Sequence, residues 1–200
     1  MYKWRKMSDE ERKEELAFRK DSAYPPHSPP HSKEEGWNRY HLTAAIFEHE
    51  SVIGKSDERM SAFSSELCAA LSVDGNTAIY AWCVLPNHWH ALVGCGELKD
   101  LMEHVRLLHG RSSHLWNGED DARGRKCWHC TADRRIRSDR HFYAVRNYIH
   151  NNPVKHGYVK KWREWEFSSA ADYLDEVGDE EAARLWREYP VLDMGEKWDL

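Results

Sequence analysis

Two patterns of apolar residues alternate along this 200-residue chain and predict its elements. Apolar residues three or four positions apart are typical of a helix, whereas apolar residues at every second position are typical of a strand. Helical spacing and helix-forming composition predict helices within residues 9–20, 56–76, 97–116 and 138–152. Alternating and β-rich segments predict strands within residues 40–50, 77–85, 88–95 and 127–136.

The first predicted helix is bounded by clear local signals. Ser8 followed by Glu11 is a capping-box pattern, which favours a helix that begins at residue 9. After this helix, residues 23–32 read AYPPHSPPHS, with four prolines within six positions. Proline has no amide hydrogen and a fixed φ, so this stretch predicts an extended linker or surface arm.

Two further prolines bound elements later in the chain. The pair 86–87, Pro-Asn, separates two β-rich runs and favours a hairpin between them. The last predicted helix starts at a cap residue, Ser138 or Asp139, and we expect it to stop before Pro153 because proline disfavours helical geometry in the residue before it.

The resulting order of elements is β-α-β-β-α-β-α. This order predicts an α+β fold of the ferredoxin-like type, an antiparallel sheet with helices on one face, followed by a C-terminal tyrosine-bearing helix. We expect three parts: an N-terminal helix and proline-rich arm at 1–38, a single folded domain at 39–165, and an acidic tail at 166–200.

Composition narrows the class of protein. No stretch has the roughly 18 apolar residues that a membrane span requires, and the charged start lacks the apolar region of a signal peptide, so we expect a cytoplasmic protein with no membrane partner. Five cysteines in such a protein indicate thiols rather than disulfides. Cys127 and Cys130 alone have the spacing of metal ligands, although no second pair at matching spacing stands out and a strand whose small thiols fall three apart is the simpler explanation.

Charge is distributed unevenly along the chain. Residues 81–165 carry 15 Lys and Arg against 9 Asp and Glu, whereas residues 166–200 carry 3 against 11. Basic residues interleaved with aromatic ones are typical of a surface that binds single-stranded nucleic acid, although a solvated basic face is the simpler alternative. The candidate DNA-binding residues in this block are Arg134, Arg135, Arg137, Arg140, Arg146 and Lys155.

The stretch NHWH places two histidines on either side of a tryptophan within one predicted strand. Side chains two positions apart point the same way in a strand, so His88 and His90 share one face while Trp89 points to the other. Two neighbouring imidazoles form a plausible half-site for a divalent metal. The alternative is a pair of hairpin histidines whose hydrogen bonds go to backbone or water.

A second pair lies on the last predicted helix. Tyr148 and Asn152 are four positions apart and therefore share a helical face, which places a phenol beside a hard amide oxygen. With His88 and His90 they would give a metal site and a tyrosine nucleophile for a phosphodiester. A tyrosine that only packs the helix is the alternative, and Tyr143 with Asn147 repeats the same spacing.

These segments resemble a known family. LPNHWHALV is similar to the HUH motif, and FYAVRNYIHNNPVKHGYV followed by WEFSS is similar to the tyrosine helix of the REP-associated tyrosine transposases, within the IS200-like HUH superfamily. The resemblance implies that His88, His90 and Asn152 bind Mg²⁺ or Mn²⁺ and that Tyr148 is the nucleophile. It also implies a single-stranded DNA endonuclease and strand transferase that acts near REP-like hairpins through a 5′-phosphotyrosine, as a nucleoid-associated monomer or homodimer.

Two alternatives stay open at this stage. The first is a domesticated protein of the same fold that binds DNA hairpins without cutting them, which would show salt-dependent binding and no cleavage. The second is a zinc module in which His88, His90, Cys127 and Cys130 hold one structural ion, which would unfold when zinc is chelated.

Overall fold

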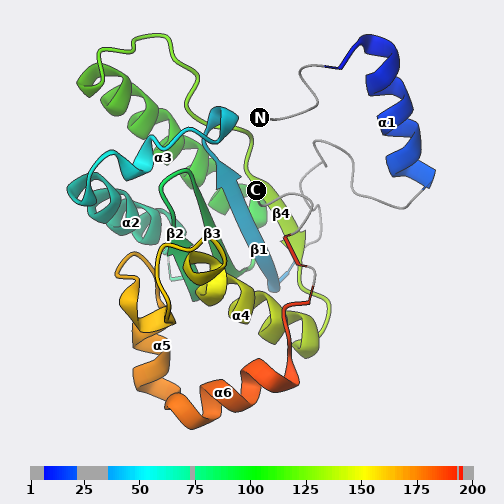
Figure 1. Cartoon of the computed structure of the whole chain (residues 1–200), viewed down its shortest axis with the longest axis vertical. Helices are drawn as coiled ribbons and strands as arrows, with labels where there is room; N and C mark the ends of the chain where they lie inside the picture. The colour runs from blue at the N-terminus through cyan, green and yellow to red at the C-terminus, as the bar shows by residue number, and fades with distance from the viewer. Residues whose placement is uncertain (1–6, 22–35, 73–74, 193, 196–200) are drawn as a thin grey trace.

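The computed structural model describes residues 7–21, 36–72, 75–192 and 194–195 (Figure 1). Its strands are β1 (Asn38–Ala45), β2 (Thr77–Val84), β3 (His88–Cys95) and β4 (Ala132–Arg135). Its α-helices are α1 (Asp9–Asp21), α2 (Asp57–Leu71), α3 (Leu98–Glu119), α4 (Asp139–Lys155), α5 (Ala170–Val177) and α6 (Asp179–Glu188). Short 3-10 turns are η2 (Phe47–His49), η3 (Ile53–Lys55) and η4 (Trp162–Glu164).

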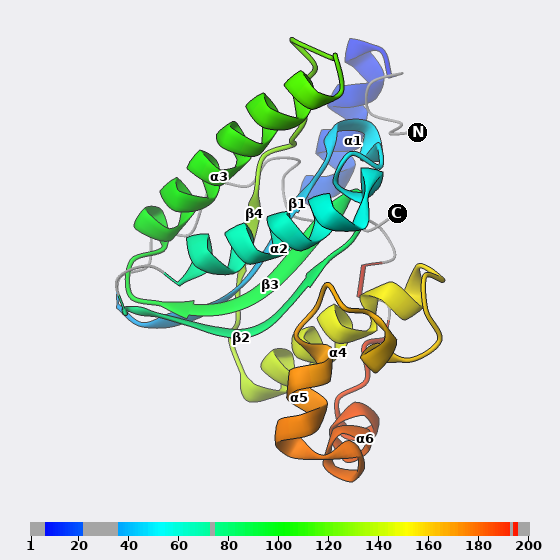
Figure 2. The same ribbon diagram turned by 90° about the vertical axis from the view of Figure 1, so that its left-hand side faces the viewer.

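The four strands form one antiparallel sheet in the order β2-β3-β1-β4. This order confirms the predicted ferredoxin-like arrangement, because β3 returns between β1 and β2 after the hairpin. Helices α2 and α3 lie on one face of the sheet, and α4 lies on the other (Figure 2). The sheet therefore separates a hydrophobic core from the face that carries the tyrosine helix.

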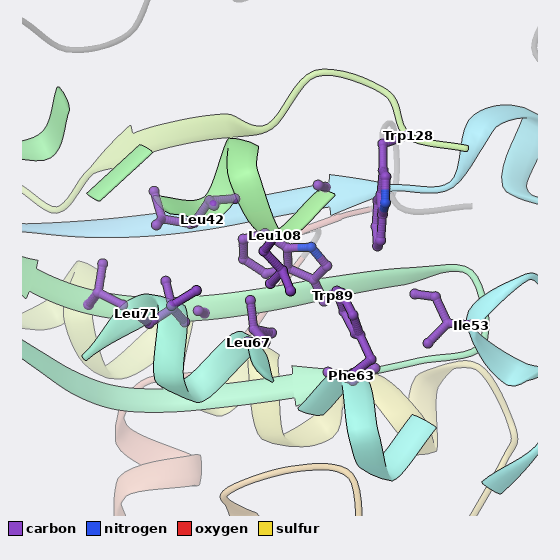
Figure 3. Packing of buried hydrophobic residues seen from close by; sticks show 14 of the residues in the cluster. Leu42, Ile53, Phe63, Leu67, Leu71, Trp89, Leu108 and Trp128 are labelled. Atoms are coloured by element: carbon purple, nitrogen blue, oxygen red, sulfur yellow. The ribbon is translucent and has the colours of Figure 1, made fainter. Parts of the chain in front are cut away.

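The larger core fills the space between the sheet and the helices α2 and α3 (Figure 3). Phe63 of α2 stacks on Trp128 with ring centroids 5.3 Å apart, and Trp89 of β3 is completely buried beside them. Trp128 also lies parallel to His109, with ring centroids 4.0 Å apart. This aromatic cluster fixes the beginning of β3 against α3.

Three predicted boundaries are wrong. The expected strand 40–50 ends at Ala45, and a 3-10 turn follows it. The expected strand 127–136 forms a continuous ladder with β1 only over Ala132–Arg135, whereas Trp128 makes an isolated bridge with Ile46 and its indole N–H donates to Ser112 Oγ at 3.1 Å. The last helix continues through Pro153 to Lys155. Proline removes only one amide donor there, and backbone bonds from His156 to Asn152 O and from Tyr158 to Pro153 O close the final turn.

The capping box is confirmed at the start of α1. The Ser8 amide donates to Glu11 Oε2 at 2.6 Å, and the Glu11 amide donates to Ser8 Oγ at 3.2 Å. The proline-rich stretch 23–32 lies outside the described residues. None of the helices in the described part of the chain has the length and apolar character that would let it cross a membrane.

The acidic tail forms α5 and α6, which pack beside α4 rather than extending as a charged strand (Figure 2). Asn147 of α4 donates to the carbonyl oxygens of Leu185 and Tyr189 at 3.2 and 2.9 Å. Arg163 pairs with Asp175 at 2.5 Å. Some of the basic residues in the middle block are therefore neutralised by acidic residues of the tail, as Arg163 is by Asp175.

A buried carboxylate joins the end of α3 to the start of α2 and to the turn before it. The Asp120 side chain is 4% exposed and accepts from Lys55, Arg59 and Arg125 at 2.6, 2.7 and 2.8 Å. The Arg59 guanidinium beside it, with help from the other two cations, holds the pKa of Asp120 well below its usual range. Ionised Asp120 therefore stabilises the fold.

We expect Asp120→Asn to lower the free energy of unfolding at pH 7 by about 2 kcal/mol, because charged hydrogen bonds are lost while Arg59 stays half-buried. The contribution of a carboxyl with a lowered folded-state pKa is complete above the ordinary pKa of about 3.9. It decreases as the pH falls below that value and is gone below the folded-state pKa. Urea denaturation should thus show the gap between wild type and variant closing under acid conditions.

Glu103→Gln is the matched control, because Glu103 also pairs with an arginine, Arg106 at 2.6 Å, but both side chains are exposed. We expect a change below about 0.5 kcal/mol for this variant. Equal losses in the two variants, or a gap that does not depend on pH, would contradict the stabilising role of Asp120.

Candidate active site

The two histidines of NHWH lie on the α4 face of the sheet, as predicted. Trp89 between them points into the core, where its indole N–H donates to His109 Nε2 at 3.1 Å. Burial lowers the pKa of His109 to about 3, so its imidazole is neutral and can accept this bond. His88 and His90 are 4% and 0% exposed, and their ring centroids lie 5.0 Å apart.

Helix α4 brings the second predicted pair to the same place. His88 Nε2 lies 3.0 Å from Asn152 Oδ1, and the ring of Tyr148 lies 5.2 Å from that of His90. Tyr148 is 1% exposed and Asn152 is completely buried. Ser138 caps the start of the helix, and its hydroxyl accepts from the amide of residue 141 at 3.1 Å. The structure therefore joins four predicted residues from two elements that are about sixty positions apart.

The repeated pair on the same helix faces elsewhere. Tyr143 stacks on Tyr189 with ring centroids 4.7 Å apart, and Asn147 donates to backbone carbonyls at the end of α6. Both residues hold α6 against α4, so their spacing reflects packing between helices. This separates them from Tyr148 and Asn152, which face the histidines of β3.

Two further histidines adjoin this cluster and were missed in the sequence. The Nε2 atom of His41 in β1 lies 3.2 Å from His90 Nδ1. The His41 ring also contacts the Tyr148 ring, with ring centroids 5.9 Å apart. His156, just after α4, contacts His88 with ring centroids 5.1 Å apart. His41 reaches the site because β1 pairs with β3, a contact that the order of residues along the chain does not reveal.

The donor atoms of the cluster fit a hard divalent cation. Asn87 Nδ2 donates to His49 O, which turns Asn87 Oδ1 toward His88 Nδ1 at 2.7 Å and assigns the imidazole proton to Nδ1. His88 Nε2 then presents a lone pair to Asn152 Oδ1, another acceptor, so a proton or a cation belongs between them. Their 3.0 Å separation equals the spacing of adjacent ligands in an octahedral site with arms of about 2.1 Å.

His90 can join the same set. His41 contacts the Nδ1 of His90, so Nε2 is the nitrogen that would face a metal. This is the usual pattern, in which a second group orients a ligating imidazole.

The two cysteines of the alternative zinc module are placed differently. Cys127 Sγ donates to Asn117 at 3.2 Å and Cys130 is exposed. Within the described ranges, no three or more His, Cys, Asp or Glu side chains come together to hold a metal ion.

The six predicted DNA-binding residues lie in different settings. Four are exposed: Arg134, Arg137, Arg140 and Lys155. Arg135 is half-buried. Arg146 instead lies 4.3 Å from the ring of Tyr173 and donates to its hydroxyl at 3.0 Å, so it holds α5 against α4. Burial, and then the charges of Arg134 and Arg137, lower the pKa of His141, which marks the β4–α4 turn as electropositive.

The C-terminal residues described reach back to the tyrosine. A methyl group added at Gly195 would lie 2.7 Å from both Tyr148 Oη and Lys155 Nζ. Gly195 has φ +87°, a conformation that side chains other than glycine rarely adopt. Lys155 Nζ itself lies 5.4 Å from the centre of the Tyr148 ring. A cation and a covering backbone segment therefore both adjoin the hydroxyl.

Comparison with known proteins gives the family. A sequence model described as "Transposase IS200 like" matches residues 38–152, which is more than half of the chain. The chain belongs to the IS200-like transposase family. The match includes β1 through Asn152 and so covers both halves of the candidate site, and it confirms the resemblance seen in the sequence. Among curated proteins, no significant match exists.

Comparison with solved structures supports the fold. A REP-associated tyrosine transposase bound to a REP hairpin superposes with a TM-score of 0.58 at 19% identity, over 74% of this chain and 86% of that one. A candidate transposase from Deinococcus radiodurans R1 gives a TM-score of 0.38 at 19% identity, over 61% of this chain and 95% of that one. The first match supports the IS200-like fold described above.

Proposed function

We propose that this IS200-like family member cleaves and rejoins single-stranded DNA next to DNA hairpins. In this proposal Tyr148 is the nucleophile, and His88, His90 and Asn152 hold a divalent ion, Mg²⁺ or Mn²⁺. The observation that carries the proposal is the meeting of Tyr148, His90, His88 and Asn152 where β3 faces α4. The hairpin as partner is suggested by the relative that was solved with a REP hairpin bound.

The proposed reaction exchanges one phosphoester bond for another. Tyr148 Oη forms a bond to the phosphorus, and the bond from phosphorus to the 3′-oxygen breaks. The tyrosine gives up its proton, the departing 3′-oxygen takes one, and the DNA 5′-phosphate stays attached to the protein. Because a phosphodiester is kept, attack by a 3′-hydroxyl reverses the step and joins strands.

The residues around the tyrosine suit this chemistry. The bound ion would act as a Lewis acid toward the phosphate. His41 keeps the His90 ring oriented through the 3.2 Å contact between them. Lys155 offers a positive charge beside Tyr148, and exposed arginines on the β4–α4 turn offer phosphate contacts for DNA that approaches from that side.

An adduct assay tests the proposal. The full chain is incubated with DNA hairpins that carry randomised single-stranded flanks, in Mg²⁺, in Mn²⁺ or in EDTA, and covalent products are separated by denaturing electrophoresis. We expect a metal-dependent adduct that contains the DNA 5′-phosphate and is removed by protease. Sequencing the captured DNA then defines the substrate.

The non-cutting alternative gives a different result in the same assay. Binding of hairpins that weakens with salt, with no adduct in any metal, would indicate a hairpin-binding protein that has lost cleavage. An adduct that forms equally well in EDTA would instead contradict the metal-binding role of His88, His90 and Asn152.

A further inference from the structure

An exposed aromatic ring lies beside the candidate active site and is not used by the chemistry above. Tyr158 follows α4, and its side chain is 46% exposed although it is large and mostly apolar. Gly157 with φ +76° reverses the chain there, and the Tyr158 amide donates to Pro153 O at 2.9 Å. The end of the tyrosine helix therefore sets the position of this ring.

One face of the Tyr158 ring packs against another aromatic side chain. Its ring stacks on Trp165 with centroids 5.3 Å apart and an interplanar angle of 29°. Trp165 is fixed in turn, because its indole N–H donates to Val84 O of β2 at 2.9 Å and its ring packs edge-on against Phe167. One face of Tyr158 is thus supported by the sheet, and the exposed part of the ring lies outward.

A continuous row of rings connects Tyr158 to the candidate metal ligands. His156 contacts Tyr158 with ring centroids 6.4 Å apart, and it contacts His88 with centroids 5.1 Å apart. A DNA strand that lies along this row, with a phosphate at the histidines and Tyr148, would therefore pass Tyr158, which is separated from His88 by the ring of His156.

The surroundings of the ring favour nucleic acid. Residues 155–163, KHGYVKKWR, include four basic residues and no acidic one, and one of the four, Arg163, pairs with Asp175 within the chain. Lys155, Lys160 and Lys161 are exposed on this segment. Cationic side chains around a supported aromatic face are the elements that bind single-stranded DNA, because phosphates meet the charges while bases stack on the ring. The phenol of Tyr158 is uncharged near phosphates at neutral pH, because a tyrosine has a pKa of about 10 and burial raises the pKa of this one.

We infer that Tyr158 is a stacking platform for one unpaired nucleobase next to the scissile phosphate. The ligand class is a base of the single-stranded flank of the hairpin substrate, and the stack positions the adjoining phosphate at Tyr148. This inference rests on the proposed function and adds to it a residue that positions the DNA.

The test uses an oligonucleotide that the full chain captures in the adduct assay. Labelled versions of it are made, each with a single abasic nucleotide at a different flank position, and their binding is measured by fluorescence anisotropy. Base stacking on an aromatic side chain contributes enough that we expect one abasic position to weaken binding about tenfold. Tyr158→Ala should weaken binding of the intact oligonucleotide by a similar factor and make that one position insensitive. Tyr158→Phe should retain the wild-type profile.

Two controls separate stacking from structural loss. Tyr158→Leu keeps an apolar cover over Trp165 without an aromatic face, so it should fold with a wild-type melting temperature and yet lose the abasic sensitivity. Trp37→Ala removes another exposed aromatic, near Gly94 at the opposite end of β3, and should leave the profile unchanged.

An abasic profile that is the same in wild type and Tyr158→Leu overturns the stacking role while adduct formation still stands. Failure of the wild type to bind hairpins or form adducts overturns the proposed function itself.

Discussion

We expect Tyr148→Phe to form no detectable covalent adduct with hairpin DNA, and Tyr143→Phe to form wild-type amounts. Removing the proposed nucleophile's hydroxyl should reduce adduct formation by about 10³-fold or more, because Tyr148 is the proposed attacking group and its ring lies against His90. Phenylalanine fills the same buried position, since the Tyr148 ring is 1% exposed and contacts His41 and His90 edge-on. Denaturing electrophoresis of both variants with the same oligonucleotide measures the result.

Tyr143→Phe is a matched control because both tyrosines lie on α4 four positions before an asparagine. Tyr143 stacks on Tyr189 of the C-terminal region, and phenylalanine can keep that stack. Anisotropy should show that both variants still bind the hairpin. Adduct formation by Tyr148→Phe at the wild-type rate, together with its loss in Tyr143→Phe, would assign the nucleophile to Tyr143 instead.

Trp89→Ala should lower the free energy of unfolding by about 3–5 kcal/mol, one of the largest losses available to a single substitution in a small domain. The indole is completely buried between the sheet and α3, and its N–H donates to His109. Truncation leaves a cavity in the aromatic cluster and removes the hydrogen bond that the neutral His109 imidazole accepts from the indole N–H. Urea denaturation followed by far-ultraviolet circular dichroism measures the change.

Trp37→Ala provides the comparison, because Trp37 is 51% exposed and its loss should change stability by less than about 0.5 kcal/mol. Trp89→Phe should fall between the two, since it keeps part of the ring and loses the hydrogen bond. A loss near zero in Trp89→Ala would contradict the view that this tryptophan anchors the strand of the two histidines.

The sequence predicted those parts of the site whose residues are close along one element. Alternation within 88–95 gave the opposite orientations of Trp89 and the two histidines, and helical spacing gave the pairing of Tyr148 with Asn152. Both follow from the periods of a strand and a helix, which any sequence displays directly.

The rest depended on contacts between elements. His41 joins His90 only because β1 pairs with β3, and its own segment contains nothing that marks it. The extension of α4 through Pro153 depends on tertiary contacts that outweigh a local preference. Arg146 looked like a DNA contact by charge, but the acidic tail folds back and places Tyr173 against it.

Strand β3 is paired on both sides and buried along its whole length. Amide hydrogens in such a strand exchange with solvent only when the molecule opens globally, so His88 and His90 belong to the most protected part of the chain. Tyr148 and Asn152 come from a helix that ends at the surface beside the added helices α5 and α6. The two imidazoles therefore lie on the strand expected to open last, and the proposed nucleophile lies on a helix whose own local opening would separate it from them.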